Sequence, residues 1–283
     1  MTRSIRAVLT VGVVCLVAVP WSARPAAAIA NGENAREGSY RFSVLLTVTG
    51  LPAEGGGTRD SSCSGALIAP RWVITAGHCF RDAAGRRVSR TVGERTVATV
   101  GRTDLRGKKG HEVEVVDVEQ AEGADVALAE LGEAVTDITP IRVATEPPRP
   151  GEVLRLTGFG LATAGGAPVT RLQTGQFTVD AYGGALVEVS GHAPRTDTSP
   201  CPHDSGGPYF RERPLSLAAV VSSGPRCPHS GPDLAARTDN LSGWITTTTA
   251  PKRPAVWIAG AAVAAALTLT LSVALLRRRI LDR

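Results

Sequence analysis

The chain has 283 residues, a formal net charge of +5 at pH 7 and 43% hydrophobic residues, and this length allows one or two folded domains. The positive balance belongs to its two ends, because residues 29–250 contain 22 Lys or Arg and 25 Asp or Glu side chains. A central segment with a net charge near −3 excludes the extended basic surface by which proteins bind nucleic acid. The arginines between residues 81 and 95 are therefore expected to lie in a solvated loop.

The N-terminus has the pattern of a secretory signal peptide. Arg3 and Arg6 precede an apolar run at residues 7–19, and the alanines at 26–28 offer a cleavage site for a signal peptidase. The run is short for a helix that stays in the membrane, so we expect residues 1–28 to be removed.

Residues 29–250 predict many short strands and almost no helix before residues 240–247. Closely spaced strands without intervening helices predict antiparallel barrels or a sandwich. Residues 139–151 contain four prolines and are expected to link two halves, whereas loops are expected at 34–38, 51–62 and 162–168. The predicted strands are β-branched or alternating runs at residues 41–49, 72–76, 112–118, 153–157, 173–179, 185–189 and 217–222.

Three polar residues have the surroundings that nucleophilic catalysis requires. Ser205 lies in a tight turn, Cys-Pro-His-Asp-Ser-Gly-Gly-Pro at 201–208, that can hold a hydroxyl at a surface. Serine is a weak nucleophile alone and needs a base and a group that orients the base. His78 ends the run Thr-Ala-Gly-His, and Asp125 begins the apolar run Asp-Val-Ala-Leu. Structural roles as a buried histidine, a strand-capping carboxylate and a turn serine are the alternatives. The remaining histidines, among them His229, are expected at the surface.

Four cysteines remain after signal removal, and an even number in an exported domain predicts two disulfides. Sequence alone leaves three pairings of these cysteines open. The spacing lacks the paired motifs of a zinc site, so we expect no metal. The four are Cys63, Cys79, Cys201 and Cys227.

In motif content and order, residues 29–245 resemble the chymotrypsin/trypsin family of serine endopeptidases. The motifs are Ile-Ala-Asn-Gly at 29–32, Trp-Val-Ile-Thr-Ala-Gly-His-Cys at 72–79, the aspartate run at 125–128, Gly-Phe-Gly at 158–160, Ser-Ser-Gly at 222–224 and Gly-Trp-Ile at 243–245. The resemblance implies an all-β fold of two antiparallel six-stranded barrels, about 29–143 and 144–245, with a cleft between them and a short C-terminal helix. It also implies hydrolysis of protein or peptide substrates without a cofactor.

The resemblance assigns a role to each candidate catalytic residue. His78 is the base, Asp125 orients it and Ser205 is the nucleophile. The backbone N–H groups of His203 and Ser205 form the oxyanion hole, although the family almost always has glycine in place of His203. Gly77 departs from the alanine that is common there, and a third disulfide common in the family is missing. The implied disulfides are Cys63–Cys79 and Cys201–Cys227. An impaired family member that serves as a binding or regulatory ectodomain is the alternative.

The resemblance also implies a substrate pocket and an activation step. Ser199 forms the pocket floor, Ser222 and Gly224 line it, and Asp233 shortens it, so we expect Lys, Arg and smaller residues to be accepted and Phe and Tyr to be disfavoured. The alternative leaves Asp233 on the surface. A new α-amino group at Ile29 pairs with Asp204, and signal cleavage before Ile29 creates it without a separate activating protease. Cleavage after Ala30 is the rival.

The C-terminal residues predict a membrane anchor. Residues 255–276 carry no charge and are long enough to span a bilayer. Three arginines follow at 277–279, which places the tail at 277–283 in the cytoplasm and the protease domain outside. Residues 251–254 form the stalk, and a buried helix is the competing interpretation of the apolar run. The sequence predicts no oligomeric state.

Overall fold

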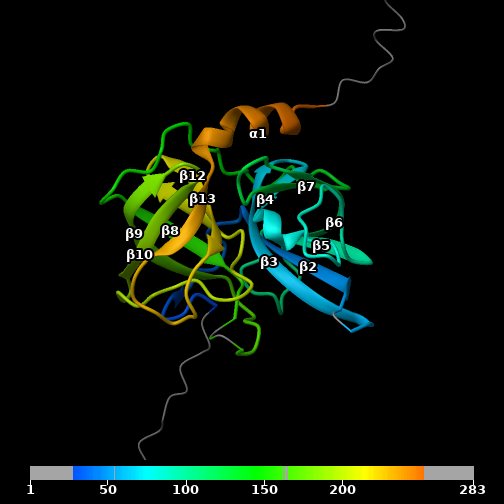
Figure 1. The fold of residues 1–283 in the computed structure, drawn as a ribbon, viewed down its shortest axis with the longest axis horizontal. Coiled ribbons are helices and arrows are strands. Elements are labelled where there is room, and N and C mark those ends of the chain that lie inside the picture. The colour runs from blue at the N-terminus through cyan, green and yellow to red at the C-terminus, as the bar shows by residue number, and fades with distance from the viewer. Residues whose placement is uncertain (1–27, 54, 162, 164, 252–283) are drawn as a thin grey trace, which may run out of the picture.

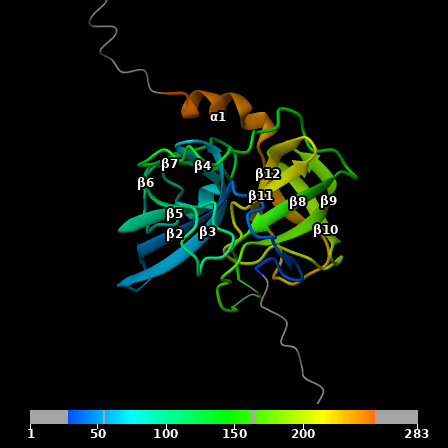
Figure 2. The ribbon, with the colours of Figure 1, turned by 180° about the vertical axis from the view of Figure 1, so that it is seen from behind.

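The computed structural model describes residues 28–53, 55–161, 163 and 165–251. These residues form two β-barrels that lie side by side, and the C-terminal helix α1 (Ser242–Thr249) lies across one end of the pair (Figure 1). Figure 2 shows the same arrangement from behind. The predicted fold of two six-stranded antiparallel barrels and a short C-terminal helix is confirmed.

The first barrel is closed by six strands in the order β2-β3-β4-β7-β6-β5. Alternation in β2 points Val44, Leu46 and Val48 into the barrel, where all three are buried, as expected of strands with one face on the core. The strands are β2 (Ser43–Pro52), β3 (Thr58–Ala69), β4 (Trp72–Thr75), β5 (Arg95–Val100), β6 (His111–Gln120) and β7 (Ala127–Leu131).

The second barrel closes through the pairing of β8 with β9, and the short strand β1 adds to its edge. The N-terminal segment therefore pairs with the second barrel, which differs from our assignment of residues 29–143 to the first. The strands are β1 (Glu33–Asn34), β8 (Val153–Gly158), β9 (Gln173–Gly183), β10 (Leu186–Ala193), β11 (Pro208–Glu212), β12 (Leu215–Ser223) and β13 (Asp233–Arg237).

Aromatic rings join the two barrels. Phe210 of β11 contacts Phe42 and Tyr40, which precede β2, with ring centroids 5.2 Å and 5.4 Å apart. Phe210 and Phe42 are buried, and aromatic pairs in this geometry add to the stability that burial provides. The cluster fixes one barrel against the other, and with it the position of any site built from both.

One predicted loop is largely strand. Residues 51–62 were expected to be irregular, but β2 runs to Pro52 and β3 begins at Thr58, with Leu51 opposite Arg59. The turn between them uses three glycines with positive φ, 85° at Gly55, 100° at Gly56 and 77° at Gly57. The backbone ladder extends this hairpin beyond the barrel, where its exposed side chains give no hydrophobic pattern.

No helix among the described residues is long and apolar enough to cross a membrane. The expected signal peptide at 1–28 (except Ala28), the stalk beyond residue 251, the anchor at 255–276 and the tail at 277–283 lie outside the described residues.

Candidate active site

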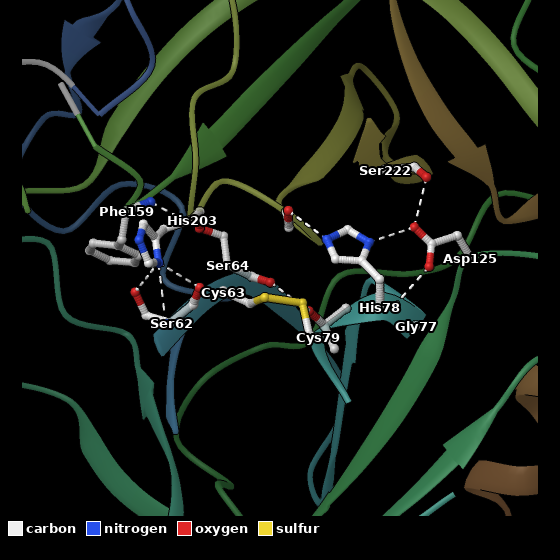
Figure 3. The surroundings of a disulfide bond; sticks show 12 residues. Ser62, Cys63, Ser64, Gly77, His78, Cys79, Asp125, Phe159, His203 and Ser222 are labelled. Carbon is white, nitrogen blue, oxygen red and sulfur yellow. Dashed lines mark hydrogen bonds and ion pairs between the residues drawn. A yellow bond between two sulfur atoms is a disulfide. The ribbon is translucent and has the colours of Figure 1, made fainter. Parts of the chain in front are cut away.

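His78 lies on a short 3-10 turn, Gly77–Cys79, directly after β4. The disulfide Cys63–Cys79 ties this turn to β3, and Asp125 precedes β7, which pairs with β4. The Asp125 carboxylate accepts two hydrogen bonds from His78, from the backbone N–H at 2.8 Å and from ring Nδ1 at 2.7 Å (Figure 3). These bonds fix the imidazole in one orientation, with Nε2 facing the second barrel.

Ser205 completes a chain of hydrogen bonds across the two barrels. Its Oγ lies 2.8 Å from His78 Nε2. Gly206 has φ of 79°, and a Cβ there would lie 2.0 Å from Thr75 Oγ1 and 2.5 Å from the backbone N of Ala76. Only glycine allows the serine loop to approach β4 this closely. The structure thus brings together the three predicted catalytic residues.

Asp125 is held ionised. Burial alone raises the pKa of its carboxyl, but the hydrogen bonds and charge of His78 and the hydrogen bond from Ser222 outweigh burial and leave the pKa lowered. Ser222 Oγ donates to Asp125 Oδ2 at 2.7 Å. A carboxylate in this position stabilises an imidazolium and selects the tautomer with the proton on Nδ1.

His203 adopts the backbone conformation that glycine usually provides. Its φ is 76°, and its ring is directed at Ser62 of β3 rather than at His78 (Figure 3). Ring Nδ1 lies 2.9 Å from Ser62 Oγ and 2.8 Å from the Ser62 carbonyl oxygen. Ser64 Oγ donates to the His203 carbonyl at 3.1 Å and accepts from the Phe159 N–H at 2.9 Å. These contacts hold a strained residue in place.

Two backbone N–H groups in the turn around Ser205 differ from their neighbours in having no hydrogen-bond acceptor within the described chain. The neighbouring N–H groups of Asp204, Gly206 and Gly207 all donate to backbone carbonyls. Within the part of the chain that the structure describes, the N–H groups of His203 and Ser205 have no protein acceptor. The His203 ring is directed at β3, where its Nδ1 contacts Ser62.

A cavity of about 300 Å³ opens beside Ser205, and its lining includes Ser222, Gly224 and Asp233. A Cβ on Gly224 would lie 1.9 Å from Asp233 Oδ1, so Asp233 directly faces the wall that Gly224 forms. Ser199 is fully buried and is not part of the cavity lining. The disulfide Cys201–Cys227 joins the two loops that border the cavity.

Asp233 forms a buried pair with His229. His229 Nε2 lies 3.1 Å from Asp233 Oδ1, and the two side chains are 10% and 2% exposed. Burial raises the pKa of Asp233 to about 7, and His229 opposes this rise. The other polar atoms of the pair, His229 Nδ1 and Asp233 Oδ2, have no hydrogen-bond partner. His229 is therefore a buried residue next to the cavity, and our expectation of a surface position was wrong.

Asp204 is fully buried behind the serine loop. Its carboxylate accepts hydrogen bonds from the N–H groups of Gly160 and Cys201, both at 2.9 Å. Burial raises the pKa of Asp204 to about 8, although these two bonds lower it. Ile29 is buried in the core of the second barrel, and its neighbour Ala30 bonds to the backbone of Ser199. Among residues 28–251, gaps excepted, Asp204 has no cationic partner.

A family model described as Trypsin matches residues 29–245, more than half of the chain. The chain belongs to the trypsin family. Similar proteins include human chymotrypsin-like elastase family member 3B, 28% identical over 218 residues (67% of this chain, 74% of the relative). Bovine proproteinase E is 30% identical over 214 residues (65% of this chain, 78% of the relative). The trypsin-family domain and these relatives identify the chain as a serine endopeptidase.

Solved structures of low sequence identity share the fold. HL collagenase has a TM-score of 0.64 at 22% identity, covering 80% of this chain and 100% of that chain. GrC has a TM-score of 0.63 at 20% identity, covering 78% of this chain and 99% of that chain.

Sequence reasoning missed several residues of this trypsin-family site. Ser62 and Ser64 hold His203 from β3, and His229 pairs with Asp233. No local motif indicates the serines, since 141 residues separate Ser62 from His203. The four-residue spacing of His229 and Asp233 would be a signal on a helix, but the segment before β13 is a loop. No group of three or more His, Cys, Asp or Glu that could hold a metal ion occurs in the described ranges.

Proposed function

We propose that this serine endopeptidase cleaves peptide bonds through an acyl-enzyme formed on Ser205. His78 is the base, and the Asp125 carboxylate orients it. The observation that carries the proposal is the continuous series of hydrogen bonds from Ser205 Oγ through His78 to Asp125, each 2.7 or 2.8 Å long. His78 Nε2 accepts the Ser205 proton during attack and later donates it to the leaving amine.

The charge that develops on the substrate carbonyl is stabilised by the N–H groups of His203 and Ser205. Losing one such donor costs about 3 kcal/mol of transition-state stabilisation. The presence of His203, where the family almost always has glycine, favours a second candidate function, that of an impaired family member retained for binding. The free N–H and the ring's position against Ser62 argue for an active enzyme.

Labelling with a fluorophosphonate probe tests the proposal. The full chain should react through Ser205, Ser205→Ala should not react at all, and His78→Ala should react at a rate lower by several orders of magnitude. A correctly folded chain that neither labels nor cleaves peptides would favour the binding protein.

Substrate choice is expected to depend on Asp233. A carboxylate that lines the cavity and faces Gly224 offers a partner to a Lys or Arg side chain and leaves less room for Phe or Tyr. Its oxygen Oδ2 is buried without a hydrogen-bond partner, and because burial of an unpaired carboxylate is costly, a substrate cation in the cavity would offset part of this cost. Ser199, which was expected at the pocket floor, is fully buried, and the cavity lining does not include it.

Activation is expected to follow signal cleavage before Ile29. The new α-amino group would pair with Asp204, whose burial without a cation is unfavourable. N-terminal sequencing of the active protein should find Ile29; an N-terminus at Asn31 together with full activity would exclude this route.

The membrane arrangement is proposed from the sequence. Residues 255–276 would span the bilayer, with the protease domain outside and the arginines at 277–279 in the cytoplasm. External proteinase added to intact cells should remove an epitope in the domain and spare a C-terminal tag. A protected domain epitope would contradict this orientation.

A further inference from the structure

A guanidinium lies beside the carboxylate that orients His78. Arg87 Nη1 is 3.9 Å from Asp125 Oδ1 and donates a hydrogen bond to the carbonyl of Ala124. The side chain of Arg87 is 32% exposed and that of Asp125 is 22% exposed, so both charges are partly withdrawn from solvent. Charges this close and partly desolvated interact more strongly than surface pairs.

The local fold keeps a space open for Arg87. A Cβ on Gly77 would lie 2.9 Å from Arg87 Nη1 and 2.6 Å from Gln120 Oε1. Gln120 Nε2 donates to the carbonyls of Gly77 and Val88, at 3.0 Å and 3.2 Å. The glycine that departs from the resembled family's common alanine thus leaves room for the guanidinium, while Gln120 fixes the backbone next to it.

We propose that Arg87 is a positioning residue whose charge acts through Asp125 on His78 and extends activity toward acidic pH. The inference rests on the proposed triad. A cation beside Asp125 Oδ1 weakens the stabilisation that the carboxylate gives to the His78 imidazolium, and it repels the proton that converts His78 to its inactive form. Gly77 is the position in the sequence that makes this arrangement possible.

The charged groups around this pair are few. The hollow that His78 and Asp125 border is about 550 Å³ and is lined also by Arg81, Arg87 and uncharged residues of β12 and of the segment before Asp125. Arg81 donates to the Gly85 carbonyl and is exposed. Among the described residues that line this hollow, Asp125 is the single carboxylate and Arg81 and Arg87 are the two guanidinium groups. A unit charge at such a range moves a protonation equilibrium by about 0.5 pH unit at low ionic strength.

The test is the acid limb of the kcat/KM profile, which reports the protonation of the free enzyme. Arg87→Gln removes the charge and keeps a polar side chain, and we expect the limb to move up by about 0.5 pH unit. Arg87→Lys should restore the wild-type limb, and 1 M salt should reduce the difference between Arg87→Gln and wild type. Arg90→Gln, which removes an exposed charge from the same loop, is the matched control and should not move the limb.

Gly77→Ala is an independent variant, because it displaces the guanidinium without removing any charge. It should move the acid limb in the same direction as Arg87→Gln. Histidine-selective NMR of the full Ser205→Ala chain in detergent follows the His78 ring without turnover and should show the same change with Arg87→Gln. An acid limb and an NMR titration that both stay at their wild-type positions in Arg87→Gln would overturn the inference. An inactive wild type would refute the proposed function, and the NMR titration would then decide this inference alone.

Discussion

The burial of Asp204 allows us to predict how the free energy of unfolding depends on pH in a chain that retains residues before Ile29. Burial raises the pKa of this carboxyl from its ordinary value of 3.8 to about 8. Between these two values the folded chain holds a proton that the unfolded chain has released. Stability therefore falls as the pH rises, beginning near the unfolded pKa and ending near the folded one.

One proton bound on folding sets the slope of the free energy of unfolding against pH. Each pH unit between the two values should lower the free energy of unfolding by about 1.4 kcal/mol, so the loss from pH 5 to pH 7 is about 3 kcal/mol. The assay is urea unfolding at pH 5, 6 and 7 of the inactive Ser205→Ala chain with residues retained before Ile29. Asp204→Asn in the same chain is the control, because the amide keeps the shape and cannot titrate. The difference between the two slopes isolates Asp204.

A chain that begins at Ile29 provides the comparison. Its free α-amino group would pair with Asp204, lower the pKa of the carboxyl and remove this fall in stability between pH 5 and 7. Equal pH slopes for Asp204 and Asp204→Asn in the extended chain would refute the reasoning, since the carboxyl would then gain no proton on folding.

Three further predictions concern the site itself. His203→Gly should keep kcat/KM within about threefold of wild type, because glycine adopts a positive φ freely. His203→Val should lower kcat by about 100-fold, because it disturbs one oxyanion donor. Steady-state kinetics distinguish the two variants, and a large loss in the glycine variant would give the ring a catalytic role. Since burial raises the pKa of Asp233 to about 7, cleavage after Lys relative to Met should rise from pH 6 to pH 8 in a matched peptide series, and Asp233→Gly should abolish this rise. Gly224→Ala should lower kcat/KM for peptides by about tenfold or more, because a Cβ there would overlap Asp233 Oδ1. Fluorophosphonate labelling of Ser205 should continue in this variant. Unchanged peptide cleavage would mean that Asp233 does not border the occupied pocket.

The sequence predicted those parts of the fold in which local pattern and long-range pairing agree. Strands with β-branched or alternating residues, such as β6 and β8, were expected close to their observed bounds. β3 was not among the predicted strands, and its outer part, Thr58–Ser62, is polar, exposed or half-buried, and held by backbone pairing with β2. Hydrophobic periodicity carries no information about such a segment.

In the candidate site too, the sequence predicted some residues and not others. The motifs around His78, Asp125 and Ser205 were sufficient to expect their meeting, and the structure brings them within hydrogen-bond distance. The support for His203 was not predictable, since it depends on Ser62 and Ser64 from the opposite barrel. The sequence shows Gly77 as a departure from the common alanine, but only the structure shows that a Cβ there would lie 2.9 Å from Arg87 Nη1.

The pairing of β1 with β9 has a consequence for the order in which the chain folds. Glu33 and Asn34 lie opposite Thr174 and Gln173, so β1 has no partner strand until β9 of the second barrel has been synthesised. Contacts between segments this distant in sequence form late in folding. β1 therefore reaches its final place only when most of the domain has been made. A chain synthesised only as far as the first barrel would hold His78 and Asp125 without Ser205, and β1 without its partner strand.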